Sequence, residues 1–273
     1  MIRLLALDLD GTLMDDDMVI RSHRVRQAVT AAQERGVLVT LATGRMFDFA
    51  VPFAQELGIS APLICYQGGM IQTPGSGVPL YRATMDPALM RQVLALQVRH
   101  GWHLILYADD YAFIAEQRYP ETFYQDMVGE RVVLVDDLDA VLDQHAPDKF
   151  IIFVDPDESE RVGAELQRQF DGQMEIARSH ARIVEGNPLG VSKGDALRRL
   201  AAHLGVAQGA VMAVGDQDND ATMIAWAGLG VAMGNGSPAV KAIADWVAPP
   251  LAEDGAAVAI ERFVLSAPLP TSS

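Results

Sequence analysis

The sequence predicts an α/β protein in which a doubly wound, mainly parallel sheet is interrupted by an inserted α+β domain. Both ends of the 273-residue chain alternate short apolar runs with helical periods, as βαβ units do. The middle of the chain departs from this alternation after a turn rich in glycine and proline at residues 74–79. Polar clusters follow the apolar runs in the outer parts, which is where open parallel sheets bind ligands. We therefore expect one domain built from both chain ends and a second domain between them.

The N-terminal part predicts strands that alternate with helices. Ser22 is a typical helix N-cap, the apolar residues between Val25 and Ala32 fall on one helical face, and Gly36 ends that helix. A second helix should follow Arg45, and Pro52 should kink or restart it. The strands expected here cover residues 4–9, 37–42 and 63–66.

The middle part predicts a sheet of its own. Asp86 and Pro87 occupy the N-cap and first position of a helix that Gly101 ends. Asp109-Asp110 separates two strand-like runs, which predicts an antiparallel hairpin. A further helix is expected over residues 158–170. The strands expected here cover residues 102–107, 111–115, 149–154 and 181–184.

The C-terminal part returns to the parallel pattern. Ser192 is an N-cap for a helix that ends near Gly205, and Ser237-Pro238 opens another helix. We expect the tail, residues 267–273, to be frayed. The remaining elements expected here are strands at 210–214 and 229–233 and helices at 220–227 and 254–265.

Composition excludes several classes of function. The chain has 36 acidic and 21 basic residues, a formal net charge of −15, so a broad basic footprint for nucleic acid or anionic lipid is excluded. One cysteine, Cys65, permits neither an intrachain disulfide nor a cysteine metal cluster. Asp8 and Asp10 interrupt the apolar N-terminus, and no apolar stretch reaches the ~20 residues of a membrane span. We expect a cytoplasmic protein.

The first polar cluster, Asp8-Leu9-Asp10-Gly11-Thr12, ends the first predicted strand. In a regular strand Asp8 and Asp10 would point to the same side, and neither carboxylate belongs against an apolar layer. An isolated Asp-x-Asp-Gly is also compatible with a simple acidic turn. The pair therefore needs support from other parts of the chain.

Two further clusters offer groups that suit an anion. Thr43-Gly44-Arg45 supplies a hydroxyl, an accessible backbone N–H and a guanidinium, which suit phosphate oxygens, although a Thr-Gly pair can also be only a helix cap. Ser192-Lys193-Gly194 places a lysine in the first turn of a helix, where the macrodipole disfavours a cation. A lysine in that position favours an anionic partner, and its alternative is a solvated surface lysine.

The fourth cluster, residues 215–220, has the sequence GDQDND and follows a predicted strand. Three carboxylates and two carboxamides in five residues offer hard oxygen ligands of the kind that Mg²⁺ prefers. A hydrated loop or a helix cap is the alternative. The run lacks the length and the terminal glutamate of an EF-hand loop.

The order of the four clusters along the chain resembles the haloacid dehalogenase superfamily of phosphatases, and its Cof-type branch in particular. The resemblance covers nearly the whole chain and extends to residues 190–194 and 231–235. It implies a Rossmann-like core formed by residues 1–82 and 187–273, with residues 83–186 as an inserted cap that determines substrate specificity. Two positions depart from the branch: Gln67, where asparagine is more usual, and Gly236, where alanine is more usual. The first departure leaves the role of Gln67 open.

The resemblance implies a role for each core motif. Asp8 would attack phosphorus and form an aspartyl-phosphate, and Asp10 would protonate the leaving alcohol and later deprotonate the attacking water. A Mg²⁺ ion would be bound by Asp8, the backbone carbonyl of Asp10 and Asp216. The groups implied to hold the phosphoryl oxygens are Lys193, Thr43, Asn219 and the backbone N–H groups of Leu9 and Gly44. Asp220 would orient its loop, and Arg45 would contribute at the mouth of the site.

The resemblance defines the mechanism more narrowly than it defines the substrate. A small phosphorylated metabolite is expected, and sugar phosphates, pyridoxal phosphate and flavin mononucleotide all fit a capped phosphatase. Tyr111, His180 and Arg182 are candidate cap residues for reading it, each with a packing or surface role as the alternative. A phosphomutase or phosphotransferase and a non-enzymatic receiver-like phosphoacceptor are the rival functions. The oligomeric state is open, a homo-oligomer included.

Overall fold

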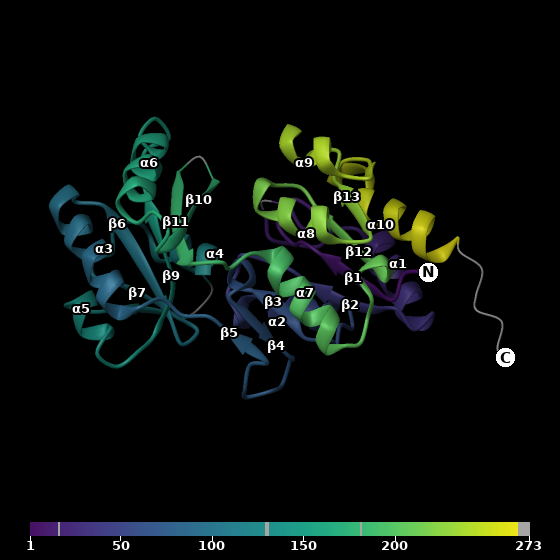
Figure 1. Cartoon of the computed structure of the whole chain (residues 1–273), viewed down its shortest axis with the longest axis horizontal. Helices are drawn as coiled ribbons and strands as arrows, with labels where there is room; N and C mark the ends of the chain where they lie inside the picture. Colours follow the sequence, from purple (N-terminus) through teal and green to yellow (C-terminus); the bar gives the residue numbers. More distant parts are fainter. Residues whose placement is uncertain (16, 129–130, 181, 267–273) are drawn as a thin grey trace. The chain divides into compact units, whose positions relative to one another are not determined.

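The protein divides into two compact units (Figure 1). The structure is a computed structural model that describes residues 1–15, 17–128, 131–180 and 182–266, without the side chains of residues 126, 127, 179 and 180. Unit 1 contains Met1–Gly44, Ala50–Leu80 and the chain from Ser192 onward, and unit 2 contains Arg45–Phe49 and Tyr81–Val191. The predicted tail and Ala181, the first residue of one predicted strand, lie outside the described residues.

The main sheet of unit 1 has the strand order β14-β13-β12-β1-β2, and its neighbouring strands are parallel. Its strands are β1 (Leu4–Leu7), β2 (Leu38–Leu41), β12 (Val211–Gly215), β13 (Leu229–Ala232) and β14 (Trp246–Val247). From β1 the chain adds β2 on one side, and after the insertion it adds β13 and β14 beyond β12 on the other. At such a reversal of strand order, open α/β sheets form a ligand crevice beyond the carboxyl ends of the strands. The predicted doubly wound sheet is confirmed.

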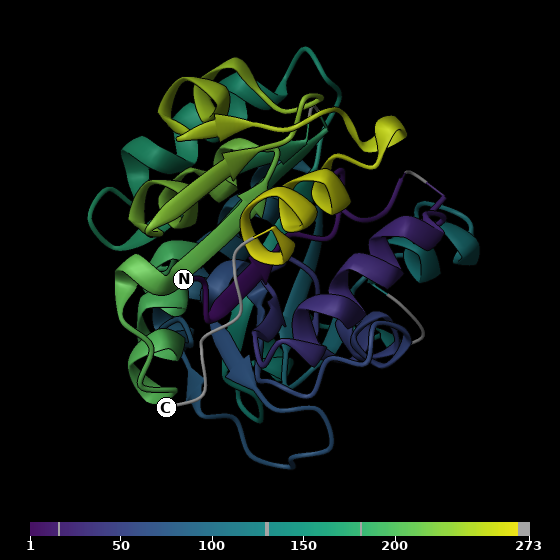
Figure 2. The same ribbon diagram turned by 90° about the vertical axis from the view of Figure 1, so that its right-hand side faces the viewer.

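Helices of the two outer chain parts accompany this sheet. They are α1 (His23–Glu34), α2 (Phe47–Glu56), α7 (Lys193–His203), α8 (Ala221–Trp226), α9 (Pro238–Ile243) and α10 (Gly255–Ile260). Short helical turns are η1 (Tyr66–Gly68), η2 (Gln208–Ala210), η3 (Asp218–Asp220), η4 (Leu251–Glu253) and η5 (Glu261–Leu265). Helix α8 contacts α7 and α9, whereas α1 contacts α10, the yellow helix of Figure 2. Ser22 caps α1 as predicted, because its hydroxyl accepts the N–H of Val25 at 3.0 Å.

The sequence predicts that Pro52 kinks or restarts the second helix. It does not restart it, because α2 runs through Pro52 as one helix, and the kink stays a prediction. The expectation that the third strand joins the parallel sheet is wrong. The strand expected at residues 63–66 is β3 (Leu63–Cys65), which pairs antiparallel with β4 (Met70–Gln72) rather than joining the parallel sheet as a full strand. A single parallel bridge between Ala42 and Ile64 connects β3 to the end of β2. The apolar run predicted the strand correctly, but its partner depends on the turn that follows.

Unit 2 is an α+β unit with a six-stranded sheet in the order β10-β11-β9-β6-β7-β8. The strands of this sheet are β6 (His103–Ala108), β7 (Tyr111–Ile114), β8 (Val132–Leu134), β9 (Pro147–Phe153), β10 (Met174–His180) and β11 (Ile183–Pro188). Unit 2 also contains β5 (Tyr81–Arg82), which is not part of this sheet. The helices are α3 (Pro87–His100), α4 (Glu121–Val128), α5 (Leu138–Val141) and α6 (Ser159–Gln169). Strands β6 and β7 form the predicted hairpin, with Asp109 and Asp110 both in the left-handed region at its turn. The inserted α+β architecture is confirmed, with α4, α5, β8 and β10 added to the elements expected.

The apolar core of unit 2 packs its helices against one face of this sheet. Leu104, Leu106, Phe150 and Ile152 contribute from the strands, and Val93 contributes from α3. On the strands, residues at every second position share a face, so His103, Tyr107, Lys149 and Glu185 lie on the opposite face. None of the helices in the described part of the chain is long and apolar enough to span a membrane.

His103 makes the stability of unit 2 dependent on pH. Its Nε2 lies 2.9 Å from the hydroxyl of Tyr124, which already accepts the N–H groups of Arg118 and Tyr119. The phenol therefore donates its one proton to His103, which keeps the ring neutral. Burial, with Arg118 adding, lowers the pKa of His103 to about 4.

We expect the free energy of unfolding to fall by about 2 kcal/mol between pH 7.5 and pH 5, because the unfolded chain binds a proton at His103 that the folded chain does not. The stabilisation that comes from the neutral His103 is fully present above pH 6.5 and is lost as the pH falls toward 4. Urea unfolding at the two pH values measures it in the wild type and in His103→Gln, with the exposed His203→Gln as control. An equal pH dependence of the unfolding free energy in wild type and His103→Gln would contradict this account.

Candidate active site

Three of the predicted clusters follow neighbouring parallel strands and so lie at one edge of the main sheet. Asp8 follows β1, and its N–H donates to the carbonyl of Val214 in β12 at 3.0 Å. Thr43 follows β2 and is buried, and Asp216 follows β12. The carboxyl ends of β2, β1 and β12 therefore carry a hydroxyl residue and two acidic residues side by side.

The remaining predicted cluster, Ser192-Lys193-Gly194, also lies at this edge, through the side chain of Lys193. Ser192 caps α7, its hydroxyl accepting the N–H of Asp195 at 3.1 Å, which places Lys193 in the first turn. The ammonium is buried and donates to Asp8 Oδ1 and to Asp220 Oδ1, both at 2.6 Å. The lysine that was predicted to have an anionic partner therefore has two carboxylates as partners. The alternative, a solvated lysine on the surface, is excluded.

The charges at this edge shift one another's pKa values. Burial lowers the pKa of Lys193, but Asp220 and Asp8 outweigh that effect, and the net shift is upward. Burial, followed by repulsion from Asp220, raises the pKa of Asp8 well above its ordinary value, although Lys193 acts in the opposite direction. Lys193 is therefore charged, and one ammonium does not neutralise the carboxylates around it.

Asp220 is held by protein donors on both of its oxygens. Oδ1 accepts from Lys193, and Oδ2 accepts the backbone N–H groups of Asp216 and Gln217 at 2.8 and 3.0 Å. A Cβ added at Gly215 would lie 2.4 Å from the Asp220 carboxyl carbon, so only glycine allows this approach. Asp220 thus fixes the loop after β12 and the lysine together.

The acidic residues fit a small divalent cation. Asp8, Asp216 and Asp220 each offer a carboxylate oxygen, and these atoms lie within 4.8 Å of one another. Burial, with repulsion from Asp220 adding, raises the pKa of Asp216 to about 6, because both effects disfavour the charged carboxylate. Asp220 accepts bonds at 2.6, 2.8 and 3.0 Å, whereas Asp216 accepts one at 3.0 Å from Gln217 and longer ones at 3.4 Å from Thr12 and Asn235. Asp8 and Asp216 are therefore the better ligands for a hard cation such as Mg²⁺.

The loop after β1 closes tightly on this cluster. Gly11 has φ +79°, and a Cβ there would lie 2.3 Å from Asp216 Oδ2. Leu9 is buried, and its carbonyl accepts the N–H groups of Leu13 and Met14 at 2.9 and 3.0 Å. Asp10 is half-buried and forms an isolated bridge with Met14. The loop therefore brings the backbone around Leu9 and Asp10 next to Asp8 and Asp216.

Sequence reasoning missed the role of Asn235. Its Nδ2 donates to the carbonyl of Gly11 at 2.8 Å and lies 3.4 Å from Asp216 Oδ2, while its Oδ1 accepts the N–H of Leu251 at 2.8 Å. Asn235 thus connects the loops after β1, β12 and β13. The available signal was its position just after a predicted parallel strand.

Gln67 contacts three of the predicted phosphate-binding residues. Its Oε1 accepts from Asn219 Nδ2 at 3.0 Å, and its Nε2 faces Gly44, where an added Cβ would lie only 2.4 Å away. Its N–H donates to the carbonyl of Thr43 at 3.1 Å. Thr43, Gly44, Asn219 and Gln67 therefore form one contiguous group in unit 1.

The candidates placed on unit 2 have local partners. The Arg45 guanidinium lies 4.5 Å from the centre of the Phe49 ring. Arg131 lies over the exposed Tyr111 ring at 5.2 Å, and Arg182 lies 3.6 Å from Asp155. The side chain of His180 lies outside the described residues. A role in substrate recognition remains a prediction for all of them.

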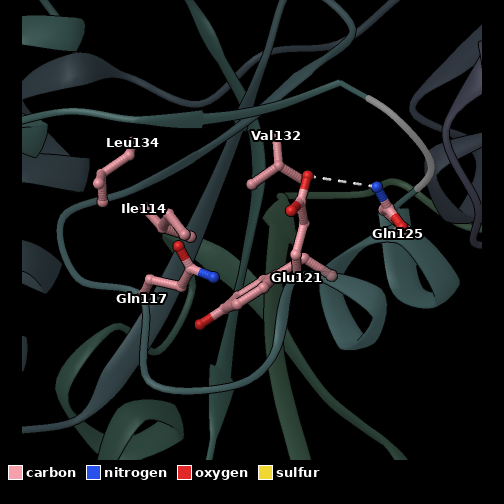
Figure 3. A pocket seen from close by; sticks show the side chains of 7 residues that line it. Ile114, Gln117, Glu121, Gln125, Val132 and Leu134 are labelled. Atoms are coloured by element: carbon pink, nitrogen blue, oxygen red, sulfur yellow. Dashed lines mark hydrogen bonds between the residues drawn. The ribbon is translucent and has the colours of Figure 1, made fainter.

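A pocket of about 140 Å³ in unit 2 is separate from these candidates (Figure 3). In Figure 3 the side chains of Glu121 and Gln125 face one another, with Gln125 Nε2 3.4 Å from Glu121 Oε1. The lining residues are Ile114, Gln117, Glu121, Tyr124, Gln125, Val132 and Leu134. No predicted site residue lines this pocket, so it is not the site that the motifs indicate.

Comparison with known proteins identifies the family. Residues 5–260 match the family model of haloacid dehalogenase-like hydrolases. The chain is 31% identical over 264 residues to the 5-amino-6-(5-phospho-D-ribitylamino)uracil phosphatase YcsE of Bacillus subtilis, covering 97% of this chain and 96% of that protein. It is 30% identical over 250 residues to the HMP-PP phosphatase of Serratia proteamaculans, covering 89% and 88% of the two chains.

A solved structure gives the same result. A haloacid dehalogenase-like hydrolase from Bacteroides thetaiotaomicron superposes with a TM-score of 0.84 at 30% identity, over 96% of this chain and 99% of that one. The family match, the phosphatase relatives and the shared fold agree with the resemblance that the motifs indicate. The chain therefore belongs to the haloacid dehalogenase-like hydrolase family, as a Cof-type phosphatase.

Proposed function

We propose that this phosphatase is Mg²⁺-dependent and hydrolyses phosphate monoesters of small metabolites through an aspartyl-phosphate on Asp8. The observation that carries the proposal is the buried Asp8–Lys193–Asp220 bridge beside Asp216, at the edge where the strand order reverses. Two carboxylates and a buried ammonium lie together there, and a third carboxylate, that of Asp216, is close to them. An enzyme that hydrolyses a phosphate monoester must lower the barrier by roughly 20 kcal/mol or more, chiefly by positioning and electrostatics.

In the proposed first step, Asp8 attacks phosphorus while Asp10 donates a proton to the leaving alcohol. Lys193 both orients the Asp8 carboxylate and provides positive charge for the phosphoryl oxygens. Thr43, Asn219 and the N–H groups of Leu9 and Gly44 would hold the remaining oxygens. In the second step, Asp10 takes a proton from water, which displaces Asp8 from phosphorus and releases phosphate.

Asp8, the Asp10 carbonyl and Asp216 would hold the Mg²⁺ ion, and Asp220 would position the loop that carries Asp216. When bound, the ion offsets the repulsion between an anionic nucleophile and an anionic phosphate. The excess of negative charge over the single ammonium supports a cation at this place.

The substrate proposal rests on the relatives. One relative is named for a phosphorylated ribitylamino-uracil and another for HMP-PP, so a phosphorylated heterocycle or sugar-alcohol derivative is a reasonable class for this chain. Sugar phosphates, pyridoxal phosphate and flavin mononucleotide stay in the set to be assayed. We further propose that unit 2 is the cap that reads the organic part of the substrate, and that the enzyme works in the cytoplasm without a nucleic-acid partner.

Release of inorganic phosphate from p-nitrophenyl phosphate tests the function. We expect multiple turnovers with Mg²⁺ and none after chelation with EDTA. A stably phosphorylated protein without turnover would indicate a phosphoacceptor, and an isomerised sugar phosphate without free phosphate would indicate a mutase. A phosphometabolite panel ranked by kcat/KM then defines the substrate class.

Asp216→Asn tests the proposed metal site. We expect the Mg²⁺ concentration for half-maximal activity to rise at least about tenfold, because a neutral amide is a weaker ligand for a hard cation than a carboxylate. Asp218→Asn is the matched control, since Asp218 lies in the same loop but is exposed and bonds Ser237. An unchanged Mg²⁺ requirement in Asp216→Asn would exclude Asp216 as a ligand.

A further inference from the structure

The segment around Gln67 has an unusual backbone. Tyr66 and Gln67 are consecutive non-glycine residues with positive φ, 54° and 58°, and Gly68 follows at 103°. Side chains disfavour this region, and it persists only where the surrounding structure enforces it. Two such residues in sequence point to a local requirement that outweighs the backbone preference.

Three site segments hold this turn in place. The N–H of Gln67 donates to the carbonyl of Thr43 at 3.1 Å, which fixes the turn to the end of β2. A Cβ at Gly68 would lie 2.3 Å from the carbonyl oxygen of Ser192, so the turn packs directly on the start of the helix that carries Lys193. The third contact is made by the side chain of Gln67, which is buried.

That side chain connects the loop after β12 with the loop after β2. Its Oε1 accepts from Asn219 at 3.0 Å, and its Nε2 occupies the space beside Gly44 where an added Cβ would lie, 2.4 Å from it. A carboxamide has an acceptor and a donor at opposite corners, so it can satisfy partners on two loops at once. The left-handed backbone at Gln67 directs this amide between the loops after β2 and β12.

We propose that Gln67 is a positioning residue for the phosphoryl group: its amide fixes the Asn219 carboxamide and the Gly44 backbone in one arrangement. With one Asn219 hydrogen bonded to Gln67, the rotation of that carboxamide is fixed, and its remaining donor has a defined direction. The tight contact at Gly44 likewise limits movement of that loop. The inference rests on the proposed function, because the oxygens to be held are those of the phosphate ester.

Gln67→Met tests the proposal, since methionine keeps the length and the unbranched Cβ but provides no amide. We expect KM for p-nitrophenyl phosphate and the inhibition constant of inorganic phosphate both to rise about tenfold, with kcat within about threefold of wild type. Gln67→Asn, which retains a shorter carboxamide, should fall between wild type and Gln67→Met. Gln72→Met is the matched control, because Gln72 lies on β4 and its side chain donates to the carbonyl of Ser76, away from the predicted site residues.

A double-mutant cycle with Asn219→Ala separates positioning from general structural damage. If Gln67 acts through Asn219, Gln67→Met should add less than about twofold to KM in the Asn219→Ala background. An equal effect in both backgrounds, or unchanged constants in a variant whose thermal midpoint matches wild type, would overturn the proposal. If wild type releases no phosphate, the proposed function fails separately. In that case the affinity for inorganic phosphate, measured by calorimetry, tests the role of Gln67 independently. Equal affinity in wild type and Gln67→Met would reject that role.

Discussion

Asp8→Asn is expected to lower kcat by at least roughly 10⁴-fold, because the amide cannot form the covalent bond to phosphorus. The shape of the side chain and its contact with Lys193 are retained, so the loss should not come from unfolding. In the metal-free protein we expect an equal or higher thermal midpoint, since burial and Asp220 raise the pKa of Asp8 and so make its carboxylate costly above that pKa.

Steady-state kinetics with an aryl phosphate and thermal unfolding in EDTA measure these two effects. Asp8→Ala guards against activity regained by deamidation of the asparagine, and Asp218→Asn is the exposed control. A kcat above a tenth of the wild-type value in both Asp8 variants would show that Asp8 is not the nucleophile.

Asp10→Asn is expected to lose most turnover while retaining the affinity for phosphate and Mg²⁺. The proposed metal ligand at this position is the backbone carbonyl, which the substitution leaves in place. General acid and base catalysis contributes about 10²–10⁴-fold, so we expect kcat to fall by that factor. Asp17→Asn, an exposed carboxylate further along the same loop, is the matched control.

Inhibition by inorganic phosphate and titration with Mg²⁺ separate binding from chemistry in this variant. A substrate with a better leaving group should lose less, because it depends less on the proton that Asp10 donates. An unchanged kcat, or a loss that is fully explained by weaker Mg²⁺ binding, would remove Asp10 from its catalytic role.

Local sequence signals predicted most of the fold. Buried parallel strands such as β1 are continuous apolar runs, and all four of its residues are buried in the structure. N-caps such as Ser22 and Asp86 act within three residues of themselves, so they can be identified without tertiary information. Both features are written in short segments of the chain.

Elements whose stability comes from tertiary packing were missed. Strand β8 has only half-buried or exposed residues, and β10 is an edge strand with the mixed sequence MEIARSH. The sequence predicts a kink or a restart at Pro52, and the structure excludes the restart, because α2 continues through this residue. In each case the neighbours in space, and not the local pattern, decide the outcome.

The site divides in the same way. The carboxylates, Thr43 and Lys193 were predictable as candidates because each follows a strand or opens a helix. Gln67 and Asn235 were not, because their contacts join residues 152 and 224 positions apart. Local motifs thus identify the candidate catalytic and binding residues, whereas the residues that position them can be identified only from the folded structure.

The central claim is that Asp8 carries the phosphoryl group during turnover. Rapid-quench trapping with a ³²P-labelled substrate and Mg²⁺, followed by peptide mapping, tests it most directly. We predict acid-stable label that forms within one turnover, decays as phosphate is released, maps to the peptide containing Asp8, and is absent in Asp8→Asn. The same experiment in Asp10→Asn adds a second test, because hydrolysis of the intermediate should be slowed in that variant. Turnover without a burst and without labelled protein at any quench time would contradict the account. Label on a residue other than Asp8 would also contradict it.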